Sequence, residues 1–196
     1  MKFDIDTPIV LLAEKLFRYL LNLSKKNKPE PPIVVFAHSQ GAIIAEHALK
    51  RLNPLEREKL RIVTLGGGSF ILPGASHPDS HNYVSAADVI CRLGSPRLQI
   101  LALFRYEGMK NGLTQKKMLE QLAMRDALLH LDSVNKEAIK AYAKTRVPYY
   151  EQEFLKISNV TVLDPDTVSF AGHEFSGPCY QTAMHNVIAQ YQKVKK

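Results

Sequence analysis

Residues 34–44 read VVFAHSQGAII, an apolar and β-branched run that passes directly into a helix-forming segment. Together with Ile33, the run predicts a short strand with two apolar faces, which is typical of the middle of a sheet covered by helices. The helix is expected over residues 42–52, where Asn53-Pro54 ends it. Ser39 is therefore predicted to lie at a turn between a buried strand and a helix.

The turn has the pattern small-x-Ser-x-Gly, formed by Ala37, His38, Ser39, Gln40 and Gly41. A sharp strand-to-helix turn brings neighbouring backbones together, so we expect small residues to be required two positions before and two after the serine. The turn lifts the hydroxyl above the sheet, at a helix N-terminus whose amides favour developing negative charge. This pattern predicts a nucleophilic serine, and the alternative is a serine that caps the helix.

The remainder of the chain alternates strands with helices. Further strands are expected at 61–65, 82–85 and 159–163, and helices at 8–23, 114–130, 135–146 and 178–192. This alternation predicts an α/β fold with a mainly parallel sheet flanked by helices. With 196 residues, the chain is expected to form a single domain, in which residues 99–156 are a helical insertion before the last strand.

The residues around Ser39 resemble the α/β-hydrolase superfamily, in particular its lipase-like serine esterases, although Ala37 stands where glycine is commoner. The resemblance implies a catalytic triad in the chain order Ser, Asp, His. Asp88 follows the strand at 82–85 and is the candidate acid, with a turn-capping aspartate as the alternative. His173 lies between the last strand and the last helix and is the candidate histidine, with a surface-loop histidine as the alternative.

The resemblance also implies a division of chemical roles. His173 would take the proton from Ser39 as the hydroxyl attacks a carbonyl, and Asp88 would hold the imidazole in the required tautomer. The backbone amide of Gln40 would donate one hydrogen bond to the oxyanion. The expected reaction is hydrolysis of a carboxylic ester, in a small molecule or a lipid, and it needs no cofactor. The sequence leaves a second function class open, a non-catalytic α/β-hydrolase-like interaction or effector module with an incomplete oxyanion hole.

The resemblance covers residues 8–193 but only the latter part of the family's pattern. A single helix precedes the elbow strand, and Lys2–Asp6 adds one short strand at most, so the second oxyanion donor has no evident source. The apolar strand from Ile33 has clear neighbours on one side only, and an exposed apolar edge favours association. We therefore expect a fragment of a longer protein, a homodimer that pairs sheet edges, or a cover formed by the N-terminal segment.

Charge and hydropathy narrow the set of partners. The chain has 26 Lys and Arg residues against 19 Asp and Glu, a net charge of +7. The basic residues form separate clusters near expected helix ends, which argues against nucleic-acid binding but leaves contact with an anionic membrane surface open. No apolar run approaches the length of a membrane span, and residues 8–13 lack a cleavage signature, so the default expectation is the cytoplasm.

Three further features allow a ligand interpretation. The HPDSH segment at residues 77–81 alternates metal-ligating side chains, yet a local cluster of this kind is more typical of a polar loop, so no metal site is expected. The GGGS segment at residues 66–69 lacks the lysine of a P-loop, and we expect small residues at a crowded strand end. The Leu-rich helices of the insertion are interpreted as core, with a lid over an acyl pocket as the alternative.

Overall fold

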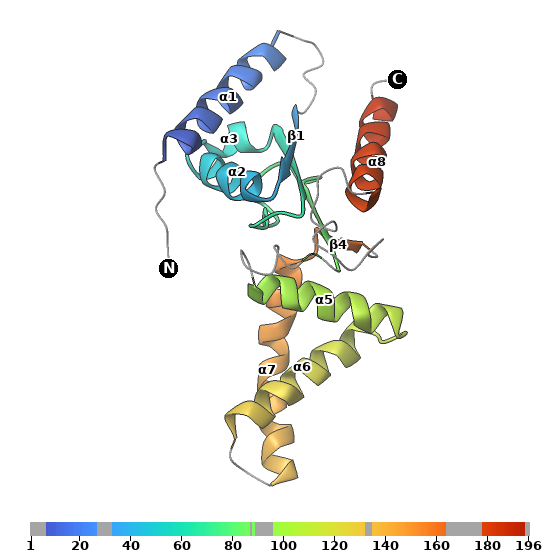
Figure 1. Ribbon diagram of the computed structural model, residues 1–196. Coiled ribbons are helices and arrows are strands. Elements are labelled where there is room, and N and C mark those ends of the chain that lie inside the picture. Colours follow the sequence, from blue (N-terminus) through green and yellow to red (C-terminus); the bar gives the residue numbers. More distant parts are fainter. Residues whose placement is uncertain are drawn as a thin grey trace. The chain divides into compact units, whose positions relative to one another are not determined.

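The structure is a computed structural model and describes residues 7–26, 33–86, 88, 96–131, 135–163 and 178–194. The chain divides into two compact units (Figure 1). One unit contains Met1–Pro96 and Asn159–Lys196, and the other contains Arg97–Ser158. None of the helices within the described ranges combines the length and the apolar character needed to cross a membrane.

The first unit is built on a four-stranded sheet in which all strands are parallel and the order is β1-β2-β3-β4. The strands are β1 (Ile33–His38), β2 (Leu60–Leu65), β3 (His81–Ser85) and β4 (Val160–Leu163). Each strand starts within one residue of the start that the sequence predicts. The predicted α/β fold with a parallel sheet and flanking helices is confirmed.

One face of the sheet is covered by α1 (Pro8–Ser24) and α2 (Gln40–Lys50). Thr7 caps α1 through its side chain and Pro8 occupies the first turn, as the sequence predicts. The apolar residues of both helices form one core cluster with the side chains of β2 that point to this face. Its buried members include Val10, Phe17, Leu21, Ala42, Ala45, Ala48, Leu49, Leu60 and Ile62.

The opposite face is covered by α8 (Pro178–Val194). Val63 and Leu65 of β2 point to this face, because alternate residues of a strand point to opposite sides of a sheet. They pack with side chains spaced three or four residues apart on α8, and the cluster consists of Val63, Leu65, Tyr180, Ala183 and Val187. Both faces of β2 are therefore buried.

Strand β1 lies at an edge of the sheet. Among the described residues it pairs with β2 alone, which agrees with the expectation from the sequence that this strand has neighbouring strands on one side only. Along this edge Val34 and Phe36 line a groove of about 240 Å³ together with Val187, Ile188, Tyr191 and Gln192 of α8. The short strand expected at Lys2–Asp6 lies outside the described residues.

The second unit consists of α5 (Pro96–Lys110), α6 (Gln115–His130) and α7 (Lys136–Lys156). The sequence prediction for the last of these is wrong at its C-terminal end, because the helix does not stop at residue 146 but continues through Pro148. A proline removes one backbone donor from a helix, and packing on both sides of it offsets that loss. Val147 and Tyr150 pack against the α6–α7 core, and Phe154 is buried.

A buried amide ties the long connection between β2 and β3 to the sheet. The Asn82 side chain is fully buried, and its Oδ1 accepts hydrogen bonds from Thr64 Oγ1 at 2.9 Å and from the Ile71 amide at 2.9 Å. Its Nδ2 donates to the Ile71 carbonyl at 3.0 Å. A buried polar group is stabilising only when it is hydrogen-bonded, so each of these contacts matters for the free energy of unfolding.

Replacing this amide tests its role in stability. We expect Asn82→Ala to lower the free energy of unfolding by about 2–4 kcal/mol, since it leaves buried partners unsatisfied. Urea denaturation measures the loss, and Asn111→Ala is the matched control because Asn111 makes a single exposed hydrogen bond. Equal stability of the two variants would contradict this account.

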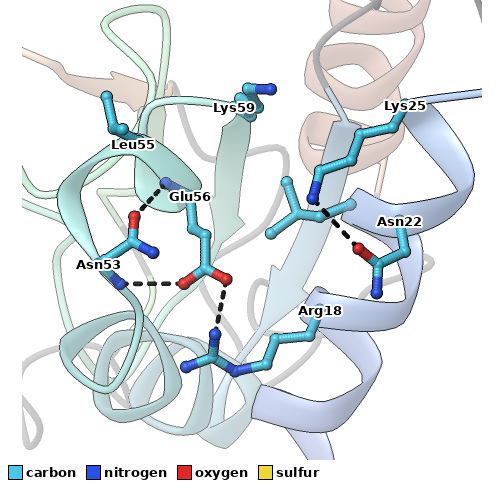
Figure 2. A pocket seen from close by; sticks show the side chains of 8 residues that line it. Arg18, Asn22, Lys25, Asn53, Leu55, Glu56 and Lys59 are labelled. Atoms are coloured by element: carbon cyan, nitrogen blue, oxygen red, sulfur yellow. Dashed lines mark hydrogen bonds and ion pairs between the residues drawn. The ribbon is translucent and has the colours of Figure 1, made fainter.

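Ion pairs fix α1 to the segment that follows α2. Arg51 Nε donates to Glu14 Oε2 at 2.6 Å, and Arg18 Nη1 donates to Glu56 Oε1 at 2.6 Å. Figure 2 shows Arg18 reaching Glu56, which also exchanges hydrogen bonds with Asn53 in a capping box. That box begins α3 (Pro54–Arg57), a short helix that the sequence analysis did not predict. The hydrogen bond from Arg51 outweighs partial burial and lowers the pKa of Glu14.

This lowered pKa makes the contribution of Glu14 dependent on pH. The carboxylate stabilises the fold above 4.5, the usual pKa of glutamate, and the contribution is lost as the pH falls below that value through the lower pKa of the folded protein. We expect Glu14→Gln to cost no more than about 1 kcal/mol at neutral pH and nothing in strong acid, as measured by denaturation across pH. Glu137→Gln removes an exposed pair and is the control. A cost that stays constant into strong acid would contradict the assignment.

Candidate active site

Ser39 has an unusual backbone conformation, with φ 53° and ψ −123°. Within the described ranges it is the only residue other than glycine with a positive φ. It lies between the last residue of β1 and the first residue of α2, at the turn that the sequence predicts. Its side chain makes no capping hydrogen bond to α2, so the interpretation of Ser39 as a capping serine is wrong. A positive φ at a residue with a side chain is strained, and such strain is concentrated at functional sites.

The glycine run after β2 holds this turn in place. The Gly68 amide donates to the Ser39 carbonyl at 2.9 Å, and the Ala42 amide donates to the same oxygen at 3.2 Å. A Cβ atom at Gly67 would lie 2.8 Å from the Cβ of Ala42, and one at Gly68 would lie 3.0 Å from Ile43. The expectation of small residues at a crowded strand end is therefore confirmed.

The described residues do not crowd Gly41. A Cβ atom at this position would meet none of them within 4 Å, so among the described residues the expectation of crowding two residues after the serine is wrong. Ala37, two residues before the serine, is buried in the core cluster of α1 and α2, as expected for a small residue at this point. The described close approach to the turn comes from the β2 side, through Gly67 and Gly68.

Asp88 is buried, with 1% of its surface exposed. Its amide donates to the Ser85 carbonyl at 3.1 Å, and its Oδ2 accepts a hydrogen bond from Tyr180 Oη at 2.7 Å. Gly66 lies against both side chains, since a Cβ atom there would be 2.8 Å from Asp88 Oδ2 and 2.8 Å from Tyr180 Oη. Gly66 also has a φ of 57°, which a residue with a side chain rarely adopts.

Ser39 and Asp88 lie at the same end of the sheet. Ser39 follows β1 and Asp88 follows β3, and the carboxyl ends of parallel strands lie on the same side. The glycine run follows β2 between them, with Gly68 against Ser39 and Gly66 against Asp88. His173 lies outside the described residues.

The remaining predicted positions are placed as follows. Gln40 is the first residue of α2, where the backbone amides of a helix have no partner within the helix. The His38 ring lies edge-on to Tyr180, with 6.1 Å between ring centroids. In the HPDSH segment, His77 Nδ1 accepts from the Asp79 amide at 3.1 Å and His81 Nε2 lies 2.7 Å from Thr161 Oγ1. No group of three or more metal-ligating side chains occurs in the part of the chain that the structure describes.

The sequence analysis gave no role to Tyr180. It lies in the first turn of α8 and is fully buried, and its hydroxyl accepts a hydrogen bond from the Ser85 amide at 3.1 Å while donating to Asp88. The spacing of Tyr180, Ala183 and Val187 on one face of the helix was the available signal. That spacing indicates burial but not a polar partner.

Comparisons with known proteins add no relative. No family model, curated protein or solved structure matches the chain. Any functional assignment therefore depends on the geometry and chemistry of the residues described above.

Gly66 and Gly41 provide a matched pair of substitutions. We expect Gly66→Ala to lower the free energy of unfolding by about 1–3 kcal/mol, because its Cβ would contact the Asp88 carboxylate and the Tyr180 hydroxyl at a positive φ. Gly41→Ala should be neutral or stabilise α2 by up to about 1 kcal/mol, since no residue in the part of the chain that the structure describes would contact the new methyl group. Denaturant unfolding of both variants measures the difference. A similar loss in both would contradict the geometry of the turn.

Proposed function

We propose that the protein is a serine hydrolase of the esterase type, which cleaves a carboxylic ester through Ser39, His173 and Asp88. The observation that carries the proposal is the strained backbone of Ser39 between a parallel strand and a helix, with a hydroxyl that does not cap that helix. Such strain costs about 1–3 kcal/mol and is found where it serves a mechanism. The buried Asp88 after β3 supplies a second component at the same end of the sheet.

The order of the elements also supports the proposal. The serine follows the first strand of a parallel sheet, the acid follows the third, and the proposed histidine lies in the chain between β4 and α8. This is the chain order Ser, Asp, His of α/β hydrolases, and we propose that the first unit corresponds to the latter part of that fold. The ester substrate is a small molecule or a lipid.

The chemistry follows from the roles of these side chains. His173 accepts the proton of Ser39 as Oγ attacks the ester carbonyl, and the amide of Gln40 donates to the oxyanion that forms. Collapse of the tetrahedral intermediate expels the alcohol, which takes the proton from His173 and leaves an acyl group on Ser39. Water, deprotonated by His173, then releases the acid and regenerates the hydroxyl. Asp88 stabilises the imidazolium in both steps.

A fluorophosphonate probe tests this proposal because it labels activated serines covalently. We expect the probe to modify Ser39 in the wild-type protein and to leave Ser39→Ala unmodified, and hydrolysis of p-nitrophenyl acetate to fall by about 10⁴-fold or more in that variant. Peptide mapping by mass spectrometry locates the label. Ser69→Ala is the control, since Ser69 belongs to the neighbouring glycine segment and hydrogen-bonds to Glu46.

Three outcomes are informative. Labelling confined to Ser39 and retained in Ser69→Ala would support the hydrolase. Labelling at another serine would contradict the assignment of the nucleophile. Absence of labelling in pure folded protein would favour the alternative of a non-catalytic interaction or effector module.

A further inference from the structure

A continuous chain of hydrogen bonds links the end of β3, the start of α8 and the proposed acid. The Ser85 amide donates to Tyr180 Oη at 3.1 Å, and Tyr180 Oη donates to Asp88 Oδ2 at 2.7 Å. Tyr180 is fully buried and Asp88 is 1% exposed. Two residues at or just after the end of β3 and one residue of α8 therefore share a chain of hydrogen bonds that is shielded from solvent.

The chemistry of the three groups fixes the direction of this path. A backbone amide can only donate a hydrogen bond, so the tyrosine oxygen is the acceptor towards Ser85. The single phenolic proton is then directed to Asp88 Oδ2, which accepts the hydrogen bond. A hydrogen bond donated to a carboxylate favours its charged form, which is the form that a triad requires.

Packing restricts both partners of the hydrogen bond between Tyr180 and Asp88. The Tyr180 ring belongs to the core cluster with Val63, Leu65 and Val187, so the hydroxyl has little freedom to move. Gly66 closes the other side, with a hypothetical Cβ only 2.8 Å from each of the two oxygens. Oδ2 of Asp88 is thereby fixed, and the rotation of the carboxylate is fixed with it.

We propose that Tyr180 is a positioning residue that holds Asp88 in the ionised form and in the rotamer that orients His173. This inference rests on the proposed function, because it assigns a task to Tyr180 only if Asp88 is the acid. Tyr180 follows His173 by seven residues, so the helix start that anchors the acid also ends the segment that carries the histidine.

The test compares two tyrosines that lie in the same core cluster. We expect Tyr180→Phe to lower kcat for p-nitrophenyl acetate by about tenfold or more without a matching rise in KM, since the lost hydrogen bond acts on the acid and not on the substrate. The control is Tyr83→Phe, which removes a phenolic hydroxyl from a half-buried residue that packs against the same cluster and should leave kcat within about twofold. Rates are measured below the unfolding transition of each variant.

A double-mutant cycle separates positioning from general structural damage. We expect Tyr180→Phe to have little further effect in an Asp88→Asn background, when the rate constant for fluorophosphonate labelling of Ser39 is measured. Tyr180→Phe should also move the acid limb of the pH–rate profile to higher pH. A carboxylate that no longer accepts the hydrogen bond from Tyr180 stabilises the imidazolium more strongly and so raises its pKa. Among the described residues, the His38 ring lies beside Tyr180 and can also titrate, so this shift must disappear in the Asp88→Asn background if Asp88 transmits it.

The outcomes distinguish this inference from the proposed function. If the wild-type protein is not labelled, the proposed function fails and the inference fails with it. If the wild-type protein is labelled but Tyr180→Phe retains its rate and its acid limb, or if the two substitutions act additively, only the inference is overturned. If Tyr180→Phe does not fold, trifluorotyrosine at position 180 is the second variant, because it keeps the shape of the tyrosine ring and its hydroxyl donates a stronger hydrogen bond to Asp88. It should move the acid limb of the pH–rate profile to lower pH. An acid limb at an unchanged pH would then overturn the inference.

Discussion

The backbone of Ser39 is the constraint on which the other features of the site depend. A residue with a side chain avoids φ 53° and ψ −123°, so the surrounding structure must compensate for the strain. The hydrogen bonds from Gly68 and Ala42 to the Ser39 carbonyl provide part of that compensation, and the parallel pairing of β1 with β2 fixes the point at which the chain turns. The turn is thus a property of β1, α2 and the end of β2 together.

The glycine run after β2 packs against both the Ser39 turn and Asp88. Gly68 lies against Ser39, which follows β1, and Gly66 lies against Asp88, which follows β3. Two residues of one short segment therefore set the distance between the ends of these two strands and the segment after β2. Neither position has room for a side chain beside its neighbours. A phosphate-binding interpretation of the same glycines is unnecessary, because close packing accounts for all three. Tyr180 then connects this arrangement to the core on the α8 face of the sheet.

The fold was predictable from the sequence because its signals are local. Apolar β-branched runs marked β1, β2 and β4, whereas β3 had a weaker signal; Thr7-Pro8 and the helical spacing of leucines marked α1. The glycine segment was also correctly interpreted as crowded. The sequence could not indicate that α7 continues through Pro148, because tertiary packing of Val147 and Tyr150 offsets a local helix breaker. The incorrect prediction of crowding at Gly41 has the same origin, because tertiary structure determines which segment packs against the turn.

The site was predictable only in part. The turn at Ser39 was predicted from its pattern, whereas the hydrogen bond between Tyr180 and Asp88 joins residues 92 positions apart, which no spacing reveals. The central claim is that Ser39 forms a covalent acyl intermediate. The most direct measurement is acid quenching of the protein during turnover of p-nitrophenyl acetate, followed by mass spectrometry of its peptides. The account predicts an acetyl group on Ser39 in the peptide that spans β1 and α2, and unmodified Ser39 with the acetyl group elsewhere or absent would contradict it.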